Sequence, residues 1–110
     1  MKRIVLAVTL VTALAVALPA LAATPTYKGT VGPGFTISMT SNPTKAGTVR
    51  LVIADKSTAH NFHLTGPGVN VKTSVPALSV STFTVNLKKG TYKFICDPHA
   101  SFMKGSFTVK

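Results

Sequence analysis

The segment of residues 92–105, YKFICDPHASFMKG, constrains the fold more than any other part of the chain. It contains the only cysteine, one of the three histidines and one of the three methionines. Tyr92, Phe94 and Cys96 occupy every second position, which is the pattern of a strand with one face in a core. The segment therefore predicts a strand that carries a thiol on its inner face, at the point where the chain leaves the sheet.

A tight turn is expected directly after this strand. Pro98 has a fixed φ and disfavours a helical conformation at Asp97, so the chain can turn and bring His99 back beside the Cys96 sulfur. Met103 follows four residues later and offers a thioether. A thiolate, an imidazole and a thioether that converge on one point suit copper that cycles between two oxidation states.

The N-terminus has the three-part layout of a secretory signal peptide. A charged start is followed by an apolar run to about residue 18 and by the small-residue cleavage motif Ala20-Leu21-Ala22. We expect residues 1–22 to be removed near Ala22, which leaves residues 23–110 as a single exported domain in the periplasm or outside the cell. The alternative is an uncleaved membrane anchor, because the apolar run is nearly long enough to span a bilayer.

The charge of the chain is strongly positive. The formal net charge is +10, and without Lys2 and Arg3 it is +8. Such a field favours acidic partners and raises encounter rates, although solubility alone is an equal interpretation. Nucleic acid is not an expected partner, because the basic residues are dispersed and no DNA-binding motif is present. We expect a monomer.

Short alternating segments separated by turn formers cover the rest of the exported domain. Strands are expected within residues 27–31, 35–40, 49–55, 60–64, 82–87, 91–96 and 106–110, and residues 69–77 could hold a strand or a loop. About seven short strands with turn signals between them predict an all-β, antiparallel Greek-key sandwich. The lone cysteine cannot form a disulfide within the chain, so it is a free thiol or a metal ligand.

The pattern Tyr92-x-Phe94-x-Cys96-x-Pro98-His99-x-x-x-Met103-x-Gly105, with His60-Asn61 upstream, resembles the cupredoxins, the small blue copper proteins. The resemblance covers nearly all of residues 23–110 and implies one type 1 copper ion. It implies Cys96, His60 and His99 as the three strong ligands and Met103 as the weak axial ligand. The spacing between His99 and Met103 is one residue shorter than in plastocyanin-like loops and one longer than in amicyanin-like loops, which leaves the subfamily open.

Two histidines compete for the upstream position. His60 is preferred because on a strand it shares a face with Phe62 and Leu64, whereas His63 points the opposite way. Asn61 is expected either to tie the two ligand-bearing segments together or to lie in a surface loop. Met39 is expected in the core, and Phe102 could be core or part of an apolar rim around the metal.

An enzyme is not expected, because the exported domain has only two acidic side chains and an open catalytic metal position would need nearby acid–base groups. Zinc is the rival metal, but structural zinc sites usually close with a further cysteine or histidine rather than a thioether. The sequence therefore predicts a single-electron carrier between redox partners that present acidic docking surfaces. The alternative is a non-redox protein that binds or delivers copper.

Overall fold

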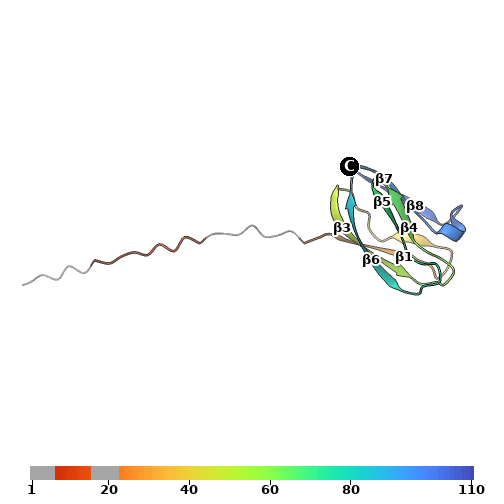
Figure 1. Ribbon diagram of the computed structural model, residues 1–110, viewed down its shortest axis with the longest axis horizontal. Helices are drawn as coiled ribbons and strands as arrows, with labels where there is room; N and C mark the ends of the chain where they lie inside the picture. Colours follow the sequence, from red (N-terminus) through yellow and green to blue (C-terminus); the bar gives the residue numbers. More distant parts are fainter. Residues whose placement is uncertain (1–6, 16–22) are drawn as a thin grey trace, which may run out of the picture.

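Strands account for nearly all of the regular structure in the part of the chain that the computed structural model describes, residues 7–15 and 23–110 (Figure 1). The strands are β1 (Thr26–Val31), β2 (Ile37–Met39), β3 (Gly47–Asp55), β4 (His63–Gly66), β5 (Val69–Lys72), β6 (Val80–Leu87), β7 (Gly90–Ile95) and β8 (Lys104–Val109). One turn of 3-10 helix, η1 (Asp97–His99), lies between β7 and β8. Most of these strands follow from apolar residues at every second position, as expected.

Residues 7–15 contain neither helix nor strand. The charged start and the cleavage motif of the predicted signal peptide lie outside the described residues. Among the residues described, none belongs to a helix that is long and apolar enough to span a membrane.

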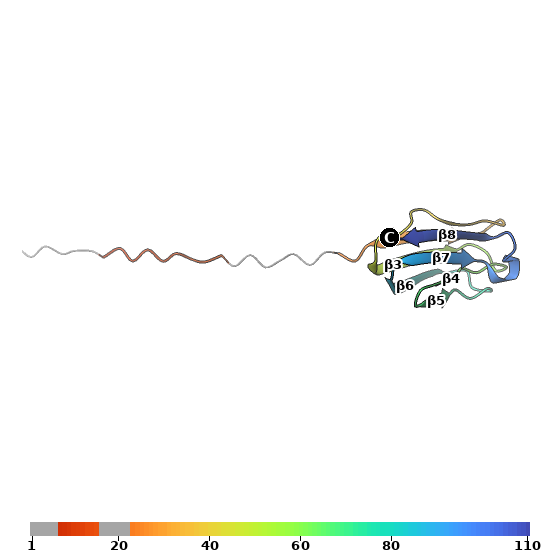
Figure 2. The same ribbon diagram turned by 90° about the horizontal axis from the view of Figure 1, so that it is seen from above.

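The strands form two four-stranded sheets, with the orders β2-β1-β3-β6 and β5-β4-β7-β8. The chain passes between the sheets after β3, β5 and β6, which confirms the sandwich (Figure 2). The described residues contain eight strands, because residues 69–77, which were expected to hold a strand or a loop, include β5. One detail differs from the expected antiparallel arrangement: β1 pairs with β3 in parallel. The parallel pair arises because β2 reverses the chain on one edge of β1 before β3 returns on the other.

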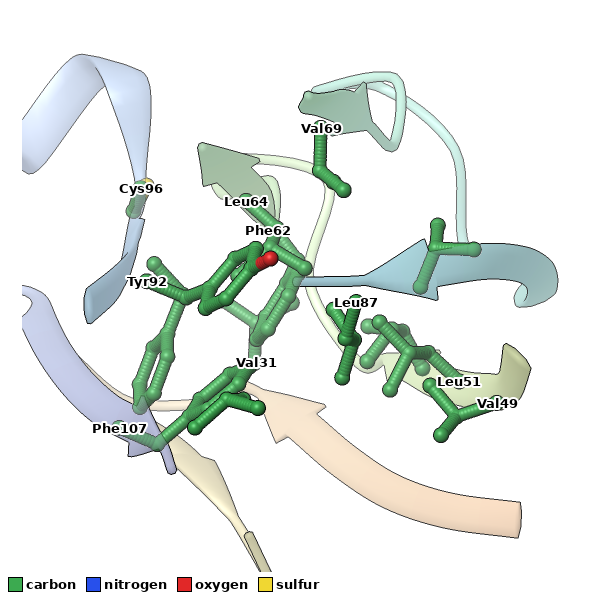
Figure 3. Packing of buried hydrophobic residues seen from close by; sticks show 14 of the residues in the cluster. Val31, Val49, Leu51, Phe62, Leu64, Val69, Leu87, Tyr92, Cys96 and Phe107 are labelled. Carbon is green, nitrogen blue, oxygen red and sulfur yellow. The ribbon is translucent and has the colours of Figure 1, made fainter. Parts of the chain in front are cut away.

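Side chains from both sheets fill the space between them (Figure 3). Tyr92 stacks on Phe107 with ring centroids 5.3 Å apart, and Phe62 stacks on Phe94 at 5.4 Å. Full burial of one such apolar side chain contributes about 1.5–3 kcal/mol to folding. Cys96 belongs to the same core and is fully buried, so its thiol packs against other core side chains.

The start of the second predicted strand is wrong. Phe35 was expected to alternate with Ile37 as a half-buried residue, but β2 begins only at Ile37 and Phe35 is 66% exposed. The reason is the preceding turn, where Gly32 has a φ of 70° and the chain runs through two more turn residues before it can pair with β1. Phe35 is thereby left at the end of the sandwich where η1 lies.

Candidate metal centre

Three donor atoms from two distant segments meet at one end of the sandwich. Cys96 and His99 come from the turn after β7, whereas His60 comes from the segment before β4. The Nδ1 atoms of His60 and His99 are 3.1 Å apart, and the Cys96 Sγ lies 3.8 Å from the first and 3.5 Å from the second. His60 and Cys96 are buried, and His99 is half-buried. The cluster therefore has one side toward solvent.

The turn that presents Cys96 and His99 is closed by backbone hydrogen bonds. The His99 N–H donates to the Cys96 carbonyl at 3.0 Å, which is the tight return predicted from Pro98. The Cys96 N–H donates to the Met103 carbonyl at 3.0 Å, and the Met103 N–H donates to the His99 carbonyl at 2.9 Å. These bonds fix the two donor residues relative to each other and to Met103, the residue directly before β8.

The triangle of donor atoms fits one metal ion. A point in its plane lies about 2 Å from all three atoms, close to the bond lengths that imidazole nitrogen and thiolate sulfur make to divalent metals in proteins. One soft sulfur and two imidazoles form the trigonal donor set that selects copper in blue-copper sites. The residues present therefore fit a copper ion of this type.

The segment that carries His60 is not a strand. β4 was expected to begin at His60 but begins at His63, and the preceding residues are held by Thr73 instead. The Phe62 N–H donates to the Thr73 Oγ1 at 2.8 Å, and the Thr73 N–H donates to the Phe62 carbonyl at 2.9 Å. His60 is nevertheless buried, with 3% of its surface exposed, and Phe62 is fully buried. Both side chains therefore point inward as expected, although the segment is not a strand.

Asn61 connects the two donor-bearing segments. Its Oδ1 accepts a hydrogen bond from the Asp97 backbone N–H at 2.8 Å, and its Nδ2 donates to the Asp97 Oδ2 at 2.8 Å. The same Nδ2 lies 3.3 Å from the Thr73 carbonyl, to which it also donates. Asn61 is only 2% exposed, so the alternative of a surface-loop asparagine is wrong.

His63 lies apart from the donor cluster. Its Nδ1 is 2.8 Å from the Asp97 Oδ1, and its Nε2 is 2.6 Å from the Asn70 Oδ1. The hydrogen bond to Asp97 raises the pKa of His63 above its ordinary value of 6.5, against a smaller opposing effect of burial. Burial tends to raise the pKa of Asp97, but the hydrogen bonds from His63 and Asn61 outweigh it and lower that pKa. The structure thus brings His60, rather than His63, to the Cys96 sulfur.

Met103 is buried in the same core as Cys96, with 1% of its surface exposed. Its backbone is bonded to both Cys96 and His99, which keeps the residue beside the cluster. Met39 is partly buried and packs against the core, as expected.

The rings of two exposed phenylalanines, Phe35 and Phe102, pack against His99. The ring centroid of Phe35 is 5.2 Å from His99 and 5.4 Å from His60, and that of Phe102 is 5.5 Å from His99. Phe102 is 56% exposed, so it belongs to an apolar rim and not to the core. Phe35 was not predicted from the sequence to lie in this rim, because the contact joins residues far apart along the chain.

The family is decided by a sequence match over most of the chain. The model of the cupredoxin-like domain matches residues 5–109. The chain belongs to the cupredoxin-like family. No curated protein sequence matched this cupredoxin.

Solved structures share the fold of this cupredoxin at low sequence identity. Reduced rusticyanin is 22% identical, with a TM-score of 0.62 over 83% of this chain and 82% of that chain. Auracyanin from the photosynthetic bacterium Roseiflexus castenholzii is 21% identical, with a TM-score of 0.57 over 81% and 99%. A methionine-to-glutamine variant of amicyanin in the Cu(I) state is 17% identical, with a TM-score of 0.55 over 77% and 82%.

Proposed function

We propose that this cupredoxin binds one type 1 copper ion and carries single electrons between redox partners. Cys96, His60 and His99 are the three strong ligands, and Met103 is the weak axial one. The observation that carries the proposal is the triangle of one sulfur and two Nδ1 atoms with sides of 3.1, 3.5 and 3.8 Å. Copper held by this donor set supplies a one-electron couple between Cu(I) and Cu(II).

The protein contributes rigidity to the site. Cys96 sits on the packed core, His60 is held by the segment bonded to Thr73, and Asn61 fastens that segment to Asp97. Second-shell hydrogen bonds of this kind keep ligands oriented. A donor set that cannot rearrange favours neither oxidation state strongly, which keeps the reorganisation on electron transfer small.

Electrons pass between the copper and a partner through His99. Its Nδ1 faces the sulfur, so the opposite edge of the ring turns away from the cluster, and the residue is half-buried while His60 is not accessible. Phe35 and Phe102 make the surface around this edge apolar, which suits a close, water-poor contact.

Known properties of the structural relatives agree with a redox role. The solved structures include rusticyanin in its reduced form, auracyanin reduced with dithionite, and an amicyanin variant with Cu(I). The proposal includes export to the periplasm or cell exterior, on the strength of the signal-peptide pattern in residues 1–22. It treats the protein as a carrier and not as an enzyme.

The visible spectrum of the protein after addition of Cu(II) tests this function. We expect an intense thiolate-to-copper charge-transfer band, and we expect Cys96→Ser to remove it while the fold persists. Copper that binds without this band would refute the type 1 assignment.

A further inference from the structure

The outer face of the sheet β5-β4-β7-β8 carries a concentrated positive charge. The pairing register places Lys72, His63, Ile95 and Lys104 in one row across the four strands, and Asn70, Thr65, Lys93 and Ser106 in the next. The three lysines are exposed. Figure 2 shows the four strands side by side in the same order.

Among the described residues, only one acidic side chain, Asp97, interacts with any of these lysines, and it interacts with Lys72. The chain has only two acidic residues. Asp55 is buried, with 5% of its surface exposed, and Asp97 gives one carboxylate oxygen to His63 and the other to Asn61. One partly compensating acid against three exposed lysines leaves the face with an excess of positive charge, which is concentrated at Lys93 and Lys104.

A hollow of about 330 Å³ opens between two of the lysines. It is lined by Lys93, Ile95, Lys104, Gly105 and Ser106. Lys93 pairs with Ser106, and Ile95 with Lys104, so Lys93 and Lys104 lie on a diagonal across strands β7 and β8. A carboxylate placed between them would meet both charges and the Ser106 hydroxyl.

We propose that this face, defined by Lys72, Lys93 and Lys104, binds clustered carboxylates of a protein partner, in addition to the apolar contact proposed at His99. One partner carboxylate would sit in the hollow between Lys93 and Lys104. One part of this inference rests on the proposed function: the identification of the partner as a redox protein. The inference adds the location of the surface and the chemistry of the partner.

The dimensions favour a protein over a small anion. Lys72 and Lys104 are separated by three strand spacings, roughly 14 Å at about 4.8 Å per strand. That distance exceeds the reach of one small anion and matches several carboxylates on a surface. A second copy of this chain would bring the same positive charge and be repelled.

A lipid surface is the less favoured occupant. Faces that bind membranes combine cations with large exposed apolar side chains. Here the exposed large apolar residues among the described residues of the sandwich, Phe35, Leu78, Val80 and Phe102, all lie off the rows of this face.

The opposite sheet supplies a matched control. Lys28 and Arg50 are exposed on β1 and β3, and they too lie on a diagonal between neighbouring strands. A variant with Lys93→Gln and Lys104→Gln and one with Lys28→Gln and Arg50→Gln lose the same net charge. Any difference between them reports the position of the charges and not their sum.

The test is an amide NMR titration of the Cu(I)-loaded protein with an octaglutamate peptide at low ionic strength. We expect shifts concentrated in β7 and β8, and an affinity lowered about five-fold by the Lys93/Lys104 variant but little changed by the Lys28/Arg50 variant. Addition of salt should abolish the difference, because exposed charges are screened. A preserved spectrum of dispersed amide resonances verifies that both variants fold.

Equal losses in the two variants, or shifts spread over both sheets, would overturn the proposal in favour of net charge alone. Binding to phosphatidylglycerol vesicles that depends on Lys93 and Lys104, without binding of the peptide, would overturn it in favour of a membrane. The peptide titration measures charge, and Lys93 and Lys104 are not proposed copper ligands, so the same titration of the copper-free protein gives an answer even where copper does not bind. Failure of the docking surface and failure of the proposed function are thus separate results.

Discussion

Two hydrogen bonds join Asn61 and Asp97 beside the donor cluster: the Asn61 Oδ1 accepts one from the Asp97 backbone N–H, and the Asn61 Nδ2 donates one to the Asp97 Oδ2, each at 2.8 Å. The pair joins the segment of His60 to the turn of Cys96. These two segments are separated along the chain by several strands. The hydrogen bonds between Asn61 and Asp97 therefore restrain the distance between His60 and Cys96 directly.

Replacement of Asn61 by Ala should lower the free energy of unfolding by about 2–3 kcal/mol. The change removes both hydrogen bonds of the buried Asn61 side chain to Asp97 and leaves the Asp97 N–H without its partner in a part-buried position, which costs more than the loss of an exposed hydrogen bond. Chemical denaturation measures the effect. Asn42→Ala, in an exposed loop, is the control and should stay within about 0.5 kcal/mol of the original protein. A silent Asn61→Ala would show that the pair does not restrain the segments.

The His63–Asp97 pair should make stability depend on pH. Because the pKa of His63 is raised above 6.5, its contribution is fully present below that pH and is lost as pH rises through the raised pKa. Because the pKa of Asp97 is lowered below 3.8, its contribution is present above that pH and is lost as pH falls through the lowered pKa. The contribution of the pair is therefore greatest between these two ordinary values.

His63→Gln should consequently destabilise the protein most between pH 3.8 and 6.5, and the difference should shrink above the raised pKa of His63. The effect should not exceed about 1 kcal/mol, since the Asp97 side chain is 38% exposed and solvent screens the pair. Denaturation midpoints across this range check it, and a constant difference at all pH values would contradict it.

Gly105→Ala should destabilise the fold by about 1–3 kcal/mol. A methyl group at Gly105 would collide with the ring of Phe94, its partner across β7 and β8, and Phe94 is 5% exposed and stacked on Phe62. Gly34→Ala is the matched control, because nothing lies within 4 Å of the added carbon there. Equal thermal midpoints for the two variants would show that Phe94 can move aside.

These features differ in how far the sequence predicts them. The strand with Tyr92 and Phe94 and the turn back to His99 depend on local alternation and on Pro98, and both were predicted correctly, although β7 ends one residue before Cys96. The choice of His60 over His63 also followed from alternation, although the segment proved irregular.

Contacts between distant segments were harder to predict. The position of Phe35 beside His99, and the use of both Asp97 oxygens, depend on how loops from different strands meet. The parallel pairing of β1 with β3 depends likewise on where β2 reverses the chain. Alternation specifies which residues face inward, but it carries no information on which loops become neighbours.

The axial role of Met103 is tested by two substitutions with opposite expected effects. Met103→Gln offers a harder oxygen donor that favours Cu(II), so the reduction potential should fall. Met103→Leu keeps the bulk without a donor, so the potential should rise. Protein film voltammetry measures both values. Unchanged potentials in both variants would mean that Met103 serves only as a core residue.

The central claim, that this cupredoxin carries electrons on copper it retains, is tested most directly by a spectroelectrochemical cycle in the presence of an external Cu(I) chelator. We predict that the charge-transfer band bleaches on one-electron reduction and returns fully on reoxidation, over repeated cycles, without transfer of copper to the chelator. Loss of the band together with capture of the copper by the chelator would contradict the claim and identify a copper-delivery protein instead.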